Sequence, residues 1–238
     1  MTAVERVIEV AGDELRVPPA DEVHVRTTDA RQSTADVIRR VLDILLSVLM
    51  LAAAAPVLVV VAAAIRIDSP GSAIFRQPRV GRGGRLFTFY KFRGMYVDAR
   101  ERWPELYDYD YSASQLHDLR FHPARDPRVT RVGRFIRRTS IDELLNLCNV
   151  LKGDMNIVGP RPEIPEMMPH YGDAVATFLS VKPGITSLAK VTGRDELTFT
   201  ETLALDLEYI RCRSIPLDLK IMCATAATVL LQRGVLGG

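Results

Sequence analysis

An apolar run from Ile44 to Ile65 is the feature that most constrains how this chain can fold. Its 22 residues carry no charge, and Ser47 is the only polar side chain among them. A helix of this length extends over about 33 Å, which matches the hydrocarbon core of a bilayer. Because the run begins beyond residue 40 and is longer than the apolar core of a secretory signal peptide, it predicts a membrane anchor that stays attached.

Pro56 lies near the middle of this run and bears on how the chain meets the bilayer. Proline removes one backbone hydrogen bond from a helix and favours a break or kink. Positive charge flanks both ends of the run, at Arg39 and Arg40 before it and at Arg66 after it, so the positive-inside rule favours neither orientation. We therefore expect a re-entrant helix that breaks at Pro56 and returns to the same side; a single kinked crossing is the alternative.

The rest of the chain divides into two parts around this segment. Residues 1–35 combine many acidic residues with little periodicity, which predicts a disordered or mobile acidic tail. We expect the membrane-embedded re-entrant helix to span 36–66 and one further domain to span 67–238. Residues 66–100 carry eight arginines and lysines against two aspartates, a net charge of +6. Such a charge in a short segment indicates a surface that binds anions.

The pattern of residues 67–238 predicts an α+β fold that is mainly helical. Short β-prone runs at Ala73–Phe75 and Leu86–Phe92 flank a glycine-rich turn, and they predict a small antiparallel β hairpin beside the membrane. An amphipathic helix is predicted from Ile141 to about Gly153, and a strongly apolar one from about Pro216 to Gln232. We expect amphipathic helices to lie at the membrane surface. For the last helix, a place in the core is the alternative.

Two adjacent carboxylates, Asp142 and Glu143, follow a run rich in arginine, and this layout suits chemistry on a phosphate. Ser140, with Glu143 three residues later, predicts a capping box at the start of a helix. The free N–H groups and the dipole at a helix start favour anions, so both acids should stay ionised and a phosphate should bind at the same place. An ordinary helix start without any catalytic role is the competing interpretation.

Arg161 stands between two prolines in the string Gly159–Glu163, and this turn fixes the direction of its guanidinium. A guanidinium held in this way suits bidentate contact with phosphate. A surface arginine in a proline turn is the alternative. Further turns at Lys182–Gly184 and Gly193–Asp195 offer additional cations.

Ordered strings along the chain carry a resemblance to one family. They are Ile67–Gly71, Phe75–Gln77, Arg79–Gly81, Tyr90–Arg93, Arg131–Phe135, Arg137–Leu144, Asn149–Asp154, Gly159–Glu163, Lys182–Thr186 and Leu217–Lys220. Taken in this order, from about residue 39 to the C-terminus, the chain resembles the bacterial sugar transferases, which are monotopic phosphoglycosyl transferases that begin polyprenol-linked glycan assembly. The match is to the small, catalytic-core form of the family.

The resemblance implies an enzyme of the cytoplasmic membrane whose catalytic domain, residues 67–238, faces the cytoplasm. Such an enzyme transfers a sugar-1-phosphate from a UDP-sugar to undecaprenyl phosphate and releases UMP, which initiates exopolysaccharide, capsule, O-antigen or glycoprotein glycan assembly. It also implies Mg²⁺. By position, Asp142 would be the nucleophile that forms an aspartyl phosphosugar intermediate, and Glu143 would hold the metal together with Asp142. The resemblance further implies phosphate or nucleotide contacts at Lys91, Arg137, Arg161 and Arg194, supporting acids at Asp218 and Asp206, and a lesser role for Tyr209.

The chain departs from the family pattern at a few positions, namely Ala55 where the membrane break usually has a serine before proline, Gly94 where a serine is usual, and Ser187, Lys190 and Thr192. The competing function is a membrane-attached basic module that binds lipid or an assembly partner without catalysis. Nucleic acid is not an expected partner, since the sequence shows no helix-turn-helix, zinc-finger or aromatic stacking motif. A homodimer is compatible with the sequence.

Overall fold

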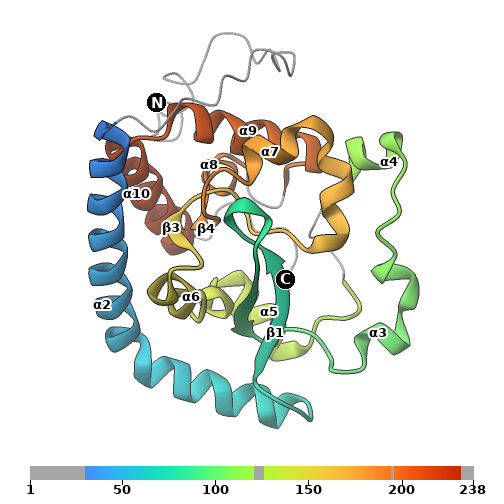
Figure 1. The fold of residues 1–238 in the computed structure, drawn as a ribbon. Helices are drawn as coiled ribbons and strands as arrows, with labels where there is room; N and C mark the ends of the chain where they lie inside the picture. The colour runs from blue at the N-terminus through green and yellow to red at the C-terminus, as the bar shows by residue number, and fades with distance from the viewer. Residues whose placement is uncertain (1–29, 121–125, 194–195, 232–238) are drawn as a thin grey trace.

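The computed structural model describes residues 30–120, 126–193 and 196–231, and the description below is limited to them (Figure 1). The chain is mainly helical with two small sheets, which confirms the predicted balance of helix and strand. The α-helices are α2 (Ala30–Asp68), α3 (Ala99–Arg102), α4 (Ala113–Asp118), α5 (Arg131–Arg138), α6 (Asn146–Lys152), α7 (Val175–Phe178), α8 (Leu188–Thr192), α9 (Phe199–Cys212) and α10 (Ile215–Leu231). The 3₁₀ turns are η2 (Arg82–Gly84), η3 (Pro104–Tyr107), η4 (Ile141–Glu143) and η5 (Pro165–Ala174).

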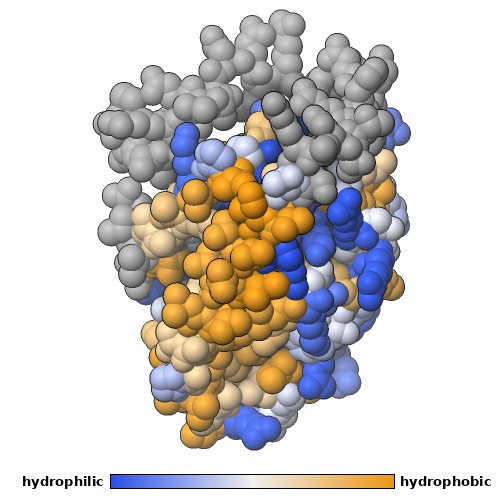
Figure 2. Space-filling view, turned by 60° about the vertical axis from the view of Figure 1, so that its left-hand side comes forward, coloured by the Kyte–Doolittle hydropathy of each residue, from blue (hydrophilic) through white to orange (hydrophobic). Residues whose placement is uncertain are grey.

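Helix α2 contains the apolar run and is longer at both ends than the predicted range of 36–66. Figure 1 shows that it runs down one side of the domain and then changes direction to pass beneath it. Pro56 lies inside the helix, and the hydrogen bond that it removes accounts for a change of direction there. The helix is long and apolar enough to cross a membrane, and only 11% of its most apolar window is buried. Its outward side is the apolar face in Figure 2.

Both ends of α2 are fastened to the domain. Near its start, Arg39 Nε donates to Asp218 Oδ2 of α10 at 2.6 Å, and Arg40 donates to the carbonyl of Leu151 at 2.8 Å. At its end, Asp68 Oδ2 accepts from the N–H of Val132 in the first turn of α5 at 3.0 Å. Arg93 donates to the carbonyl of Ser69 at 2.7 Å, in the manner of a cation at a helix C-terminus.

The predicted hairpin is confirmed. Strands β1 (Ile74–Val80) and β2 (Leu86–Phe92) pair antiparallel, with Ile74 opposite Phe92 and Val80 opposite Leu86. Positive φ angles at Gly83 and Gly84 close the turn between them, which glycine adopts at no steric cost. A second sheet pairs β3 (Asn156–Val158) in parallel with β4 (Gly184–Thr186). The main core fills the space between β2, the second sheet and helices α6, α8, α9 and α10.

The predicted capping box at Ser140 is wrong. Ser140 adopts a left-handed conformation with φ of 57°, and its side chain makes no cap hydrogen bond. The reason is that the chain must turn sharply after α5 before it can enter α6, and a residue in the left-handed region cannot present its hydroxyl to the next turn as an N-cap does. The two acids therefore lie on the short 3₁₀ turn η4, and α6 starts only at Asn146 and ends before Gly153.

Candidate active site around Asp142 and Glu143

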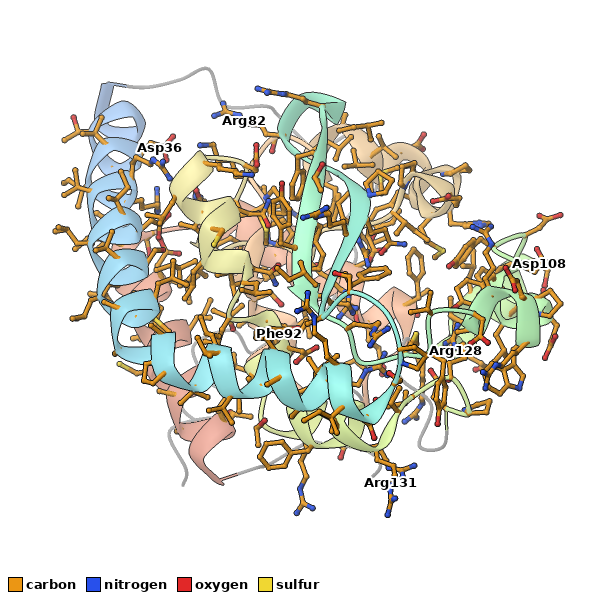
Figure 3. All side chains as sticks on the ribbon, turned by 90° about the horizontal axis from the view of Figure 1, so that it is seen from below. Asp36, Arg82, Phe92, Asp108, Arg128 and Arg131 are labelled. Carbon is orange, nitrogen blue, oxygen red and sulfur yellow. The ribbon has the colours of Figure 1, made fainter. Side chains whose placement is uncertain are left out.

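The turn η4 packs against the part of α2 that follows Pro56. Ile141 and Leu145, on either side of the two acids, pack with Val61 and Ile65 of α2 and with Phe92 of β2. Figure 3 views this region from below, where α2 passes over Phe92 and the side chain of Arg131 of α5 extends outward beside the helix. This packing holds the acidic pair close to the apolar helix.

Asp142 is only 8% exposed. Burial and the neighbouring Glu143 raise the pKa of Asp142 to about 6, while the positive charges of Lys91, Arg137 and Lys190 act against that rise. A buried carboxylate is normally costly, and nearby cations reduce the cost. The structure thus brings the predicted nucleophile together with two of the predicted phosphate-binding residues, Lys91 and Arg137.

Glu143 differs from its neighbour. Lys190 of α8 donates a short hydrogen bond to Glu143 Oε2, and the Glu143 side chain is 31% exposed. Burial alone would raise the pKa of Glu143, but Lys190, with Arg161 and Lys91, lowers it below its usual range. The predicted cause of ionisation, the geometry of a helix start, is therefore wrong. Cations stabilise the ionised form of Glu143, whereas burial disfavours the ionised form of Asp142. Opposed environments on adjacent carboxylates are typical of acid–base and nucleophilic sites.

Lys91 comes from the end of β2. Burial lowers the pKa of its ammonium group to about 8, and the charges of Arg137, Arg79 and Arg161 act in the same direction, while Asp142 opposes them. Its Nζ also lies 5.6 Å from the centre of the Phe75 ring on the paired strand. A crowded set of positive charges that is not fully balanced favours the binding of a polyanion.

Arg161 lies beside an acid, Glu163, that was not predicted as a site residue. Glu163 is 2% exposed, and its carboxylate lies 3.7 Å from Arg161 Nε and 3.9 Å from Arg79 Nη1. The backbone N–H of Val80 donates to the carbonyl of Glu163 at 2.9 Å, which fixes the proline turn against β1. Glu163 thus places two guanidinium groups side by side. Sequence reasoning missed Arg79 and Glu163, although both lie in strings that carry the resemblance.

Asp206, which the resemblance implied as a supporting acid, contacts the backbone of Arg161. Its Oδ2 accepts from the backbone N–H of Arg161 at 3.2 Å. Burial, together with the nearby Glu163, raises the pKa of Asp206 to about 8 despite the opposing effect of Arg161. Among the residues that the structure describes, its Oδ1 has no hydrogen-bond partner. Asp206 therefore supports the backbone of the proline turn as a largely protonated acid.

Arg137 reaches the site from α5 because two glycines allow the close approach of that helix. A Cβ on Gly133 would lie 2.0 Å from the carbonyl oxygen of Gly94, and a Cβ on Gly94 would lie 3.3 Å from Arg137 Nε. The Gly94 departure from the family pattern thus leaves room for this guanidinium. Arg137 Nη1 also lies 3.9 Å from Asp126 Oδ2.

Other predicted residues lie apart from this cluster. Asp218 binds Arg39 and accepts a hydrogen bond from the Tyr209 hydroxyl at 2.7 Å, so its contacts in the described part of the chain join α2, α9 and α10. Pro56 is exposed within α2. Arg194 lies outside the described residues.

The carboxylates of Asp142 and Glu143 are the groups of the site that could bind a metal ion. Within the described ranges no group of three or more histidine, cysteine or acidic residues is arranged so that it could hold a metal ion. Mg²⁺ commonly takes one or two carboxylates and completes its coordination with water and substrate phosphates. Asp142 and Glu143 therefore fit Mg²⁺ bound together with a pyrophosphate, and they do not fit a closed structural metal site.

Comparison with known proteins gives a consistent result. The family described as bacterial sugar transferase matches residues 34–232. The chain is 44% identical over 199 residues to the galactosyl transferase CpsE of Streptococcus agalactiae, a match that covers 83% of this chain and 43% of that protein. It is 40% identical over 197 residues to the undecaprenyl-phosphate galactose phosphotransferase of Salmonella typhimurium, covering 83% of this chain and 41% of that protein.

A third relative is matched over more of its length. The UDP-glucose:undecaprenyl-phosphate glucose-1-phosphate transferase of Caulobacter vibrioides is 39% identical over 203 residues, covering 82% of this chain and 70% of that protein. The chain spans less than half the length of the first two relatives. The family match includes α2 from Thr34 onwards, the hairpin and every described residue of the site. The chain belongs to the bacterial sugar transferase family.

Proposed function

We propose that this protein transfers a sugar-1-phosphate from a UDP-sugar to undecaprenyl phosphate and releases UMP. The relatives named for undecaprenyl phosphate and for UDP-glucose support this choice of acceptor and donor class. The single observation that carries the proposal is the environment of Asp142. Its carboxyl group is buried among cations and its pKa is raised, whereas the pKa of the adjacent Glu143 is lowered. A basic module that only bound lipid would not need to bury a carboxylate at such a cost.

Asp142 acts as the nucleophile. Its carboxylate oxygen attacks the phosphorus that bears the sugar, the bond from that phosphorus to the bridging oxygen breaks, and UMP leaves with the electron pair. In the second step an oxygen of undecaprenyl phosphate attacks the same phosphorus and releases Asp142. Covalent catalysis divides the transfer into two in-line displacements, each of which needs negative charge to be neutralised.

The cations around Asp142 supply this neutralisation. Lys91 and Arg137 lie around Asp142, and Arg161 and Arg79 both lie beside Glu163. Guanidinium groups are suited to bidentate contact with phosphate. Asp142 and Glu143 would hold Mg²⁺, which when bound would neutralise charge on the pyrophosphate. Arg194 is proposed as a further nucleotide contact on the basis of the family pattern alone.

We further propose that α2 is re-entrant and that residues 67–238 work on the cytoplasmic face of the membrane. The exposed apolar side chains of α2 include Leu45, Leu49, Val59 and Val60, and Figure 2 shows a broad apolar face on the side of the molecule where α2 lies. The bend at mid-length and the basic residues at both ends support entry and exit on one side. A protein of this kind would meet its lipid acceptor along α2, next to η4.

The test is UMP release by the detergent-solubilised full chain, supplied with undecaprenyl phosphate and a panel of UDP-sugars in the presence of Mg²⁺. Turnover with at least one sugar is expected, and intact mass measured without acceptor should reveal a phosphosugar adduct. Asp142→Asn should lose both signals. Asp118→Asn removes an acid that is 88% exposed on α4 and serves as the matched control. Full turnover by the Asp142→Asn variant would refute the assignment.

A further inference from the structure

The ammonium group of Lys190 contacts Glu143, the carboxylate that is also proposed to hold the divalent metal ion. Its Nζ donates to Glu143 Oε2 and, at 3.2 Å, to the carbonyl of Ile185. The Lys190 side chain is 19% exposed. Nothing in the family resemblance assigns a role to this position, where the chain departs from the usual pattern.

The backbone of Lys190 is firmly fixed. It lies in α8, whose first turn is capped by Ser187, with the Ser187 hydroxyl accepting from the N–H of Lys190 at 3.1 Å. On either side of it Ala189 and Val191 are buried, and α8 packs against α9 and α10. The lysine is therefore directed at Glu143 by the fold, since its helix cannot shift without disturbing the core.

The contact between Lys190 and Glu143 also offsets a repulsion between like charges. Asp142 and Glu143 are neighbours of like charge, and each disfavours ionisation of the other. The ammonium group of Lys190 on Glu143 reduces the repulsion between the two carboxylates when neither substrate nor metal is bound. A divalent cation that binds Glu143 meets a positive charge already at the same oxygen.

From this geometry we infer that Lys190 is an internal counter-ion of Glu143 and that it competes with the divalent cation of the active site. The inference rests on the proposed function only in the identity of that cation. Binding of the metal requires the Lys190–Glu143 contact to open, so the affinity for metal is set partly by the strength of this ion pair. The lysine thus tunes metal occupancy in this member of the family.

The experiment is Mn²⁺ binding, followed by the electron paramagnetic resonance signal of free Mn²⁺, on the full chain in detergent without any UDP-sugar. Lys190→Gln should bind Mn²⁺ about fivefold more tightly than the unaltered protein, the order expected when a partly exposed ion pair no longer has to open. Lys190→Arg keeps the charge and should bind as the unaltered protein does. Lys220→Gln removes one exposed charge from α10 and should also leave the affinity unchanged.

A second readout protects the test against a variant that folds poorly. The rise in thermal midpoint on adding Mg²⁺ should be larger for Lys190→Gln than for the unaltered chain, because the stabilisation by a ligand at a fixed concentration increases with the logarithm of its affinity. Unchanged or weaker Mn²⁺ binding by Lys190→Gln overturns the inference, as does an absence of Mn²⁺ binding in every variant. Neither result depends on UMP release, so loss of transferase activity alone would refute the proposed function and leave the competition standing.

Discussion

Replacing Asp142 with asparagine should stabilise the folded protein at neutral pH while it abolishes the transfer. The fold raises the pKa of Asp142 from 3.8 to about 6, chiefly by burial. An ionised group whose pKa is raised by folding destabilises the folded state. The rise corresponds to about 3 kcal/mol at pH 7 and above, which is an upper limit for the gain because the neutral amide removes the charge but not the polar atoms.

The pH dependence follows from the sign of the shift. Because the folded state binds the Asp142 proton more tightly than the unfolded chain does, the cost is absent below about pH 4, grows as the pH rises towards 6, and is constant above that. The advantage of the Asp142→Asn variant should therefore disappear in acid. For a domain of this size, each 1 kcal/mol moves the thermal midpoint by roughly 2–4 °C.

Glu143→Gln is the matched comparison, and it should have the opposite effect. Lys190 and other cations outweigh burial and lower the pKa of Glu143, so its ionised form contributes stability that is present above its unfolded pKa and is lost as the pH falls through the lower folded value. Thermal unfolding of both variants in detergent micelles at pH 7.5 and pH 4 would measure the two effects. A destabilised Asp142→Asn variant, or two variants that change in the same direction, would refute the reasoning.

Three further outcomes test the site and its setting. Arg161→Lys should lose most of the rate of UMP release because an ammonium cannot make bidentate contact, and unchanged kinetics would exclude Arg161 from the site. The rate as a function of pH should rise towards pH 6 as Asp142 ionises and fall above about pH 8 as Lys91 loses its proton, and a flat profile between pH 5 and 9 would contradict both roles. In a background without the three native cysteines, single cysteines at residues 30 and 75 should both react with an impermeant thiol reagent only from the cytoplasmic side, whereas labelling from opposite sides would mean that α2 crosses the bilayer.

The parts of the fold that the sequence predicted depend on short-range patterns. The apolar run, the hairpin closed by Gly83 and Gly84 and the end of α6 at Gly153 follow from composition and from residues that tolerate particular backbone angles. The capping box failed because its pattern of serine and glutamate is also compatible with a sharp turn, and the choice between the two was made by how α5 and α6 pack. Patterns of a few residues carry no information on such packing.

The sequence singled out Asp142 and Glu143 but could not predict the electrostatic environment of either acid. Asp142 and Glu143 are adjacent, yet one is buried at the edge of β2 and the other meets a lysine 47 residues later in the chain. Likewise, Arg79 and Arg161 become a pair only because Glu163 bonds through its backbone to β1. Long-range contacts of this kind raise the pKa of Asp142 and lower that of Glu143, because pKa depends on burial and on the charges within several ångströms. The chemistry of the acidic pair is therefore a property of the packing of α8 and the hairpin around η4.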